Sequence, residues 1–201
     1  MPSEQALALQ VRLLFVLFLS SPWSNFFSQK EAFITYKWSE VQAVNPDTIF
    51  SLSFAKEKLS ELPVQLWKFK KLKTLNLQRN RFETLPDSIE QLTEIEFLDI
   101  SHNRFSVFQL PITRLYKLKV LKASSNKLNY ISNNIENCEK LEEIDMYDNL
   151  IEDLGKGLYK LKELRFLDLR GVMYGTIFQS QLKASLANVK IKMDPPCKCM
   201  D

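Results

Sequence analysis

Two carboxylates, Asp145 and Asp168, come nearer than any other residues of this sequence to the spacing of a catalytic site. They lie one repeat apart in the pattern described below, which places them side by side on neighbouring strands. Retaining glycosidases hold two carboxyl groups about 5–5.5 Å apart, so hydrolysis of a glycosidic bond is a chemistry that the pair would permit. An open sheet with Lys122 and Arg170 nearby offers neither a deep pocket nor differently tuned acids. We therefore expect no enzyme.

Other residue types that carry out covalent or metal chemistry predict no site either. The single histidine, His102, has no acid or nucleophile in register with it, which argues against a nucleophilic triad. The glycines at 155, 157, 171 and 175 form no phosphate-binding loop. A loose calcium site, in which Glu143 or Asp148 joins the two carboxylates, is an alternative, but oxygen ligands alone leave its rigidity unspecified. We expect neither a cofactor nor a metal.

An exact 23-residue repeat positions these side chains. Units open at Leu72, Ile95, Leu118, Leu141 and Leu164, and the first four have the form L-x-x-L-x-L-x-x-N-x-L, with other apolar residues sometimes replacing leucine. One period earlier, Ile49 opens a degenerate copy. An exact period of this length indicates a solenoid of stacked units. One unit alone cannot offset the entropy of ordering its residues, so neighbouring units must bury their apolar side chains together.

Each unit contains a short predicted strand and a polar turn. In the clearest copy, LKTLNLQRNRFETLP at 72–86, Leu75 and Leu77 lie two positions apart and share one face of the strand. An asparagine follows the strand in four units, at Asn80, Asn103, Asn126 and Asn149. An amide both donates and accepts, so we expect these side chains to join backbone groups of successive turns that would otherwise be buried without partners.

These residues resemble the leucine-rich repeat family, in the 23-residue class that has Leu-Pro after the last leucine. Leu62-Pro63 and Leu85-Pro86 carry that signature, whereas the later units depart from it at Phe108-Gln109, Ile131-Ser132 and Leu154-Gly155. The resemblance covers about residues 46 to 193. It implies an α/β fold, namely a curved solenoid with a parallel sheet on the concave face and short helices or turns on the convex face.

The two ends of the chain lie outside the repeat. Residues 1–28 combine a charged start, the apolar run LLFVLFL at 13–19 and a polar exit, which is the layout of a cleaved secretory signal. Seven apolar residues are too few for a transmembrane helix, which needs about 20. An apolar cap helix on the first repeat is the alternative. We divide the chain into a signal peptide (1–28), an N-terminal cap (29–48), the repeats (49–171) and a C-terminal cap and tail (172–201).

Both caps are expected to cover an open end of the core. Ser39 and Glu40 are typical of the start of a short helix that Asn45-Pro46 would end. Towards the C-terminus, the apolar spacing over 177–186 indicates a last helix. Alternation over 189–193 indicates an edge strand before Pro195-Pro196.

Short end motifs resemble those of exported leucine-rich repeat proteins of Gram-negative bacteria. They are FFSQKE at 26–31, NPDTIFSLSF at 45–54, ANVKI at 187–191 and PPCKC at 195–199. This resemblance implies export to the periplasm, the cell surface or the medium, an oxidising environment in which Cys197 and Cys199 could pair with each other or with a partner. Free thiols are the alternative for the cysteines, and a cytoplasmic location is the alternative to export.

Outward-facing strand residues form columns along the concave face, about 4.8 Å from strand to strand. The candidate partner-binding residues lie in these columns or just after the strands: Phe97, Asp99, Val120, Lys122, Asp145, Tyr147, Phe166, Asp168 and Arg170. Exposed aromatic and cationic groups are enriched in binding hot spots. Tolerated surface apolarity is the other interpretation, because single exposed apolar residues are normal.

Charge is sorted along the solenoid, although the net charge is only +3. Basic residues follow the strands of the early units, at Lys56, Lys58, Arg79, Arg81, Arg104 and Lys127. Acidic residues dominate the later units, at Glu142, Glu143, Asp145, Asp148, Glu152, Asp153 and Asp168. This polarity would orient a partner and raise its rate of association, while a solvated charged rim is the alternative.

We therefore expect a non-enzymatic solenoid that binds a protein or peptide, or else a glycan, through its concave face. The small net charge argues against nucleic acid as a partner. One alternative is a structural or cell-surface module without a dedicated concave ligand. If residues 1–28 are not a signal, an intracellular signalling scaffold is another.

Overall fold

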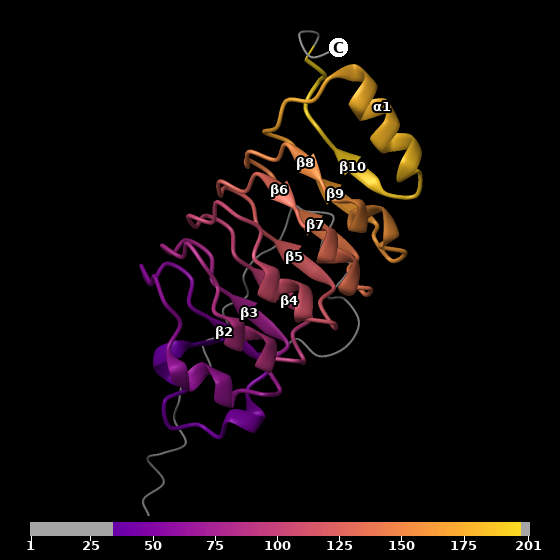
Figure 1. Ribbon diagram of the computed structural model, residues 1–201. Helices are drawn as coiled ribbons and strands as arrows, with labels where there is room; N and C mark the ends of the chain where they lie inside the picture. Colours follow the sequence, from indigo (N-terminus) through magenta and orange to yellow (C-terminus); the bar gives the residue numbers. More distant parts are fainter. Residues whose placement is uncertain (1–33, 198–201) are drawn as a thin grey trace, which may run out of the picture. The chain divides into compact units, whose positions relative to one another are not determined.

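The computed structural model describes residues 34–197, which form one unit built on a parallel sheet (Figure 1). The strands lie in the order β1-β2-β3-β4-β5-β7-β9-β10. Their bounds are Tyr36–Lys37, Ser51–Ser53, Thr74–Asn76, Phe97–Asp99, Val120–Lys122, Glu143–Asp145, Phe166–Asp168 and Lys190–Lys192. A separate two-stranded sheet pairs β6 (Tyr130–Ile131) with β8 (Asp153–Leu154). The signal predicted over 1–28 lies outside the described residues.

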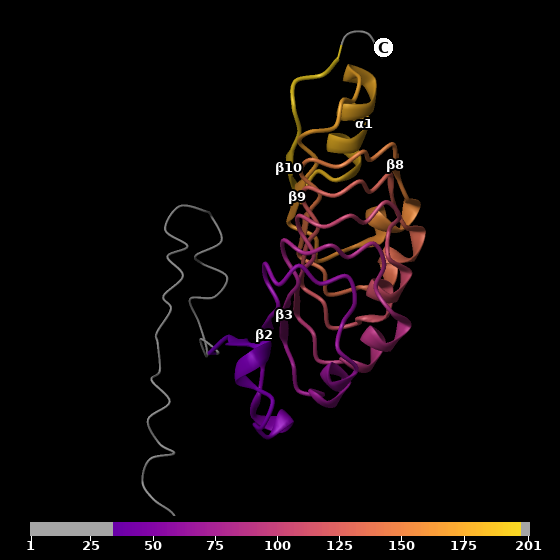
Figure 2. The ribbon, with the colours of Figure 1, turned by 90° about the vertical axis from the view of Figure 1, so that its left-hand side faces the viewer.

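Short helices return the chain from one strand to the next. In the second view they lie on the side of the solenoid opposite the large sheet (Figure 2). Five of them are five-residue 3-10 helices, one per unit: η5 (Val64–Lys68), η6 (Asp87–Gln91), η7 (Leu110–Arg114), η8 (Asn133–Asn137) and η9 (Lys156–Lys160). A 3-10 helix completes a turn in three residues and rises about 2.0 Å per residue, so it fits a return segment that is too short for an α-helix.

Strand pairing follows the repeat. Leu52 pairs with Leu75, Leu75 with Leu98, and the same step continues to Leu167 on β9. The inward-facing leucines therefore stack directly on one another, and Leu52, Leu75 and Leu98 are fully buried. The predicted curved α/β solenoid with a parallel sheet is confirmed.

The asparagine ladder is also confirmed. Asn126 Oδ1 accepts the N–H of Phe105 at 3.1 Å, and its Nδ2 donates to the carbonyls of Ile100 (3.0 Å) and Ala123 (3.1 Å). Asn80, Asn103 and Asn149 make the equivalent bonds in their own units. Each amide thus satisfies backbone groups of two successive turns.

In every unit, the residue before the repeat position that asparagine occupies in four units has left-handed backbone. Its φ is 66° at Lys56, 57° at Arg79, 54° at His102, 52° at Ser125, 56° at Asp148 and 87° at Gly171. This conformation turns the chain sharply out of the strand. Only in the sixth unit is the position filled by glycine, the residue that best tolerates it.

The N-terminal cap differs from the predicted short helix. Tyr36 pairs with Leu52 to add β1 to the sheet, and only a three-residue 3-10 helix, η3 (Trp38–Glu40), follows. Pro46 begins a second one, η4 (Pro46–Thr48), because proline's fixed φ suits the first helical position. Trp38 stacks on Phe54 with ring centroids 5.2 Å apart, so the cap covers the first repeat.

At the other end, α1 (Thr176–Ser185) and β10 cover the last repeat. Leu182 on α1 is buried, and Tyr174 before the helix donates its hydroxyl to the carbonyl of Ile151 at 3.0 Å. Cys197 is disulfide-bonded, and its N–H donates to the carbonyl of Tyr174 at 3.1 Å. Cys199 lies outside the described residues.

Candidate functional site

The solvent-facing side of the large sheet brings the predicted binding residues together. Strand pairing places four pairs of them side by side: Phe97 and Val120, Asp99 and Lys122, Lys122 and Asp145, and Asp145 and Asp168. Because β6 and β8 form their own sheet, β7 is the direct neighbour of both β5 and β9. The columns therefore run without interruption from β4 to β9, with Tyr147 and Arg170 following the ends of β7 and β9.

Three cationic side chains lie over aromatic rings on this face. The pairs, with the distance from the cationic group to the ring centroid, are Lys122 and Phe97 (5.6 Å), Arg170 and Tyr147 (5.2 Å), and Lys192 and Phe166 (5.1 Å). A cation within about 6 Å of a ring centroid is attracted by the ring quadrupole, by roughly 0.5–1 kcal/mol at exposed sites. Each pair therefore holds a long cationic side chain in place beside an aromatic surface.

Lys192 belongs to this surface but was missed in the sequence. It pairs with Asp168 across β9 and β10, at a spacing of 24 residues instead of the repeat length, so counting along the repeat does not reach it. The signal that could have found it is the alternation over 189–193. If Val189 and Ile191 face the core, Lys192 must face solvent.

One surface column contains Asn76, Asp99, Asp145 and Asp168, whose side chains hold the backbone where the strands end. Asp99 Oδ1 accepts the N–H of Ser101 at 2.9 Å. The same bond to the residue two positions on is made by Asn76, Asp145 and Asp168, at 2.9, 3.0 and 3.2 Å. This is the Asx-turn, in which the side chain takes the place of a backbone acceptor. These polar residues are therefore parts of the turn as well as of the surface.

The guanidinium of Arg170 donates two hydrogen bonds to the carboxylate of Asp168. Arg170 Nε donates to Oδ1 at 2.9 Å and Nη2 to Oδ2 at 2.7 Å, a bidentate geometry. Lys192 Nζ lies 4.0 Å from Oδ2. A buried carboxylate neutralised in this way is poorly suited to act as nucleophile or base. The pair of Asp145 and Asp168 therefore lacks the two available carboxyl groups that glycoside hydrolysis needs.

The face is less open than the sequence suggested. Val120 was expected as an exposed apolar residue but is only 4% exposed, because Phe97 and Glu143 flank it on the neighbouring strands. Asp99 and Asp168 are buried as well, while Phe97, Lys122, Asp145, Phe166 and Arg170 are half-buried. Tyr147, at 43%, is the most exposed of the predicted residues.

Glu143 is the most perturbed acid on this face. It lies between Val120 and Phe166, and its buried Oε1 has no hydrogen-bond partner within residues 34–197. Loss of hydration raises the pKa of Glu143 to about 8, opposed by attraction to Lys122 and reinforced by repulsion from Asp145. The pKa of Asp145 is raised too, first by burial. The centre of the face thus resists negative charge.

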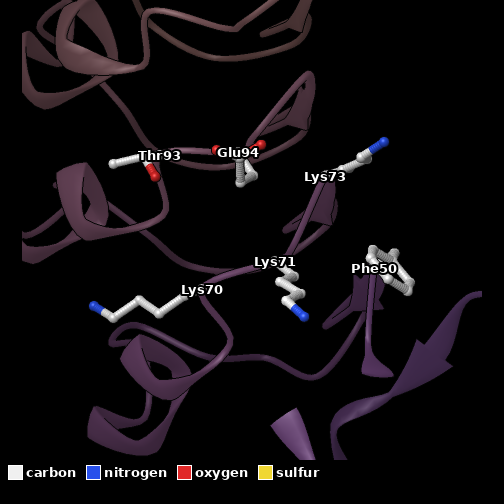
Figure 3. Close-up of a pocket in the computed structure, with 6 residues that line it drawn as sticks. All are labelled: Phe50, Lys70, Lys71, Lys73, Thr93 and Glu94. Carbon is white, nitrogen blue, oxygen red and sulfur yellow. The ribbon is translucent and has the colours of Figure 1, made fainter. Parts of the chain in front are cut away.

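A depression of about 440 Å³ lies at the N-terminal ends of β2 and β3 (Figure 3). It is lined by Phe50, Lys70, Lys71, Lys73, Thr93 and Glu94. Lys70 and Lys73 point away from each other, towards Gln91 (2.9 Å) and Glu96 (3.7 Å). This lining has no histidine or cysteine and no paired acids, so it offers no catalytic arrangement.

Residues 34–197 were also searched for metal-ligand clusters and for membrane-spanning helices. In that range no three His, Cys, Asp or Glu side chains gather closely enough to hold a metal ion. None of the helices in the described part of the chain is long and apolar enough to cross a membrane.

Comparison with known families identifies the repeat. The sequence profile of a family described as a leucine-rich repeat region matches residues 51–193. No curated protein matches the chain in sequence.

Solved structures that share the fold include two leucine-rich repeat proteins of bacteria. A leucine-rich repeat protein of Leptospira interrogans is similar with a TM-score of 0.66 and 22% identity, over 82% of this chain and 49% of that one. Internalin C2 of Listeria monocytogenes is similar with a TM-score of 0.53 and 26% identity, over 59% of this chain and 50% of that one. The chain therefore spans about half the length of these proteins.

Proposed function

Because the chain belongs to the leucine-rich repeat family, we propose that it is a non-enzymatic module that binds another protein on the solvent-facing side of the large sheet. The observation that supports this most directly is the row of three cation–aromatic pairs on that face. Aromatic and arginine side chains carry much of the binding energy in protein interfaces. The pairs sit on rigidly spaced strands, so binding orders few side chains and costs little entropy.

The residues of this face have two different parts in the proposal. Phe97, Tyr147 and Phe166 supply apolar surface, and Lys122, Arg170 and Lys192 supply hydrogen-bond donors beside it. Asp99, Asp145 and Asp168 hold the backbone at the strand ends through their turn bonds, and Asp168 also accepts a hydrogen bond from the Arg170 side chain. Val120, which is buried, supports the neighbouring Phe97.

The proposed partner is a protein or peptide that presents carboxylate or carbonyl groups next to apolar side chains. A glycan is the second class, because sugar rings stack on aromatic faces. A structural module without a ligand on this face is the competing proposal, and it gives the three pairs no part in binding.

Alanine at Phe97, Tyr147 and Phe166 together separates these proposals. The matched control replaces Tyr116 and Tyr159, two exposed tyrosines outside the sheet, by alanine. Partners are captured by chemical crosslinking on the native cell and identified by mass spectrometry. Loss of one partner in the triple variant only, with its fold intact by circular dichroism, supports the concave face. Equal capture by the unmodified protein, the triple variant and the control variant excludes the concave face as the binding site.

Export remains a proposal that rests on the sequence of residues 1–28. The division into signal, cap, repeats and tail is likewise still a prediction. The mass of the N-terminal peptide from fractionated native cells tests both. A chain that begins near Gln29 outside the cytoplasm supports export. A full-length cytoplasmic chain excludes it and favours an intracellular scaffold.

A further inference from the structure

The carboxyl group of Glu143 is buried at the centre of the concave face without a partner. Within residues 34–197, its Oε1 is the only buried side-chain nitrogen or oxygen atom that makes no hydrogen bond, and the residue is 6% exposed. Ile144 is fully buried in the core, so Glu143 and Asp145 both lie on the solvent-facing side of β7. A buried acceptor without a donor costs free energy, and a ligand that donates a hydrogen bond to it would remove that cost.

The acids around Glu143 outweigh the positive charge that reaches it. Burial raises the pKa of Glu143 to about 8, and repulsion from Asp145 adds to this effect, although two lysines attract the carboxylate. The pKa of Asp145 is raised as well, first by burial. Charged groups lie on every strand around Glu143: Lys122 on β5, Glu142 and Asp145 next to it, Asp168 on β9 and Lys192 on β10.

Both nearby lysines are directed to other groups. Lys122 lies over the ring of Phe97, with Nζ 5.6 Å from the centroid. Lys192 Nζ lies 4.0 Å from Asp168 Oδ2. A positive charge in direct contact with Glu143 must therefore come from another molecule.

One arginine of this chain is already bound on the same face in such a way. Arg170 Nε and Nη2 donate to the two carboxylate oxygens of Asp168, at 2.9 and 2.7 Å. Its guanidinium also lies over the ring of Tyr147, 5.2 Å from the centroid. Strand pairing places Phe166 directly beside Glu143, so a carboxyl group and an aromatic ring are neighbours there too. At Glu143 the guanidinium is missing.

We propose that Glu143 and Asp145 bind an arginine side chain of the partner protein. The planar guanidinium has five N–H donors and can meet both carboxyl groups at once, whereas the ammonium of lysine is a point charge. Rotation of the Glu143 side chain brings its carboxyl to the surface without a change in the backbone. The site rests on the proposed function, because it lies at the centre of the face that binds the partner there.

Other ligand groups suit this position less well. A carboxylate or phosphate would be repelled by Glu143 and Asp145. An apolar side chain would leave Oε1 of Glu143 without a hydrogen bond. A metal ion needs more ligands, and nowhere in residues 34–197 do three His, Cys, Asp or Glu side chains gather closely enough to hold one. Carboxylates of the partner suit Lys122 and Lys192, on either side of the arginine.

The test uses the peptide acetyl-Leu-Arg-Leu-amide, which presents one guanidinium between two apolar side chains. The whole chain is prepared with glutamate labelled at the carboxyl carbon, and NMR follows these carbons during titration. Glu143→Gln identifies the Glu143 signal by its loss. Glu152→Gln, at an exposed position before β8, removes a charge from the same unit and is the matched control. Two further peptides replace arginine by lysine or by citrulline, which keeps the shape of arginine without its charge.

We expect the arginine peptide to shift the Glu143 signal and the citrulline peptide to leave it in place. Glu143→Gln should bind the arginine peptide about tenfold more weakly, because a neutral amide replaces a charged acceptor, and Glu152→Gln should bind it as the unmodified protein does. A Glu143 signal that no peptide moves overturns the proposal. Equal binding of the citrulline peptide excludes a charged ligand, and equal binding of the lysine peptide excludes a site for arginine in particular.

The affinity for the arginine peptide should rise with pH. A guanidinium binds the ionised carboxyl more strongly than the neutral one, and burial raises the pKa of Glu143 to about 8 in the free protein. Binding at lower pH must therefore release a proton. The peptide should bind at least about tenfold more tightly at about pH 8.5 than at about pH 6.5. The same pH dependence in Glu143→Gln would assign the proton to another group and contradict the proposal.

Capture of the native partner separates the arginine site from the proposed function. The alanine variant at Phe97, Tyr147 and Phe166 loses the partner if the concave face binds it. If that variant loses the partner but Glu143→Gln keeps all of it, the proposed function holds and the arginine site is wrong. If the triple variant also keeps the partner, the proposed function is wrong, and a peptide-induced shift at Glu143 would still show that arginine binds there.

Discussion

Asn103 Oδ1 accepts the backbone N–H of Phe82 at 3.1 Å, and so joins two units of the solenoid. Its Nδ2 donates to Leu77 and Ile100, one carbonyl from each unit. For Asn103→Leu we expect the free energy of unfolding to fall by about 1–3 kcal/mol, because partly buried backbone groups lose their partners. Urea denaturation measures the change.

The control for this prediction is Glu57→Leu. Glu57 occupies the same repeat position in the first unit, but it is exposed. Its replacement should change stability by no more than about 0.5 kcal/mol. If both variants lose the same amount, the amide ladder does not hold the units together.

Glu143 should make stability fall as the pH rises. Loss of hydration on burial raises the pKa of this carboxyl to about 8. Between its ordinary pKa and about 8, the folded chain holds a proton that the unfolded chain has released, so unfolding becomes easier as the pH rises through this window and levels off above it. Glu143→Gln should therefore unfold less readily than the unmodified protein above about pH 8, by roughly 1–3 kcal/mol.

Near pH 4.5, about the ordinary pKa of a glutamate, the two proteins should differ little. Glu152→Gln, at an exposed position, is the control and should keep the pH dependence of the unmodified protein. Thermal unfolding across this pH range decides the matter. A curve for Glu143→Gln that runs parallel to that of the unmodified protein rules out a raised pKa at Glu143.

Gly157 is required by close packing between η8 and η9. A Cβ there would lie against the carbonyl oxygen of Asn133 and 2.7 Å from its carbon. Gly157→Ala should destabilise the protein by roughly 1–3 kcal/mol, because the two helical turns must move apart. Asn134→Ala, at the same position of the preceding unit, should have little effect. Equal melting temperatures for the two variants would show that the two helical turns can move apart without loss of stability.

The thiol of Cys138 should be unreactive in the folded protein. Its side chain is fully buried, and burial raises the pKa of the thiol to about 12. Because the thiolate is the reactive form, iodoacetamide should not modify Cys138 at about pH 8 until urea unfolds the chain. Mass spectrometry of the Cys138 peptide follows this. Rapid modification without denaturant contradicts the burial.

The repeat predicted strand pairing well where successive units are chemically alike. Leucine recurs at Leu52, Leu75 and Leu98, and register errors would move these side chains to the wrong face. At the ends the period no longer applies. Tyr36 pairs with Leu52 and Lys190 with Phe166, at other spacings than the repeat, so β1 was missed and Lys192 was not placed on the surface.

Surface properties were harder to predict than pairing. Left-handed backbone at Lys56, Arg79 and His102 leaves no signal in residue type, because the turn geometry imposes it and glycine is not needed. Burial of Val120 depends on the size of its neighbours Phe97 and Glu143. The residues of each surface column could be predicted from the sequence, but how deeply each side chain is buried could not.

The two edges of the large sheet also limit what the molecule can assemble into. At one edge, β1 is only two residues long, and at the other, β10 presents Lys190 and Lys192. A short or lysine-bearing edge is a poor template for a strand from another chain. Stacking that builds the solenoid within one chain therefore stops at its ends, and copies of the protein should not polymerise end to end into fibres.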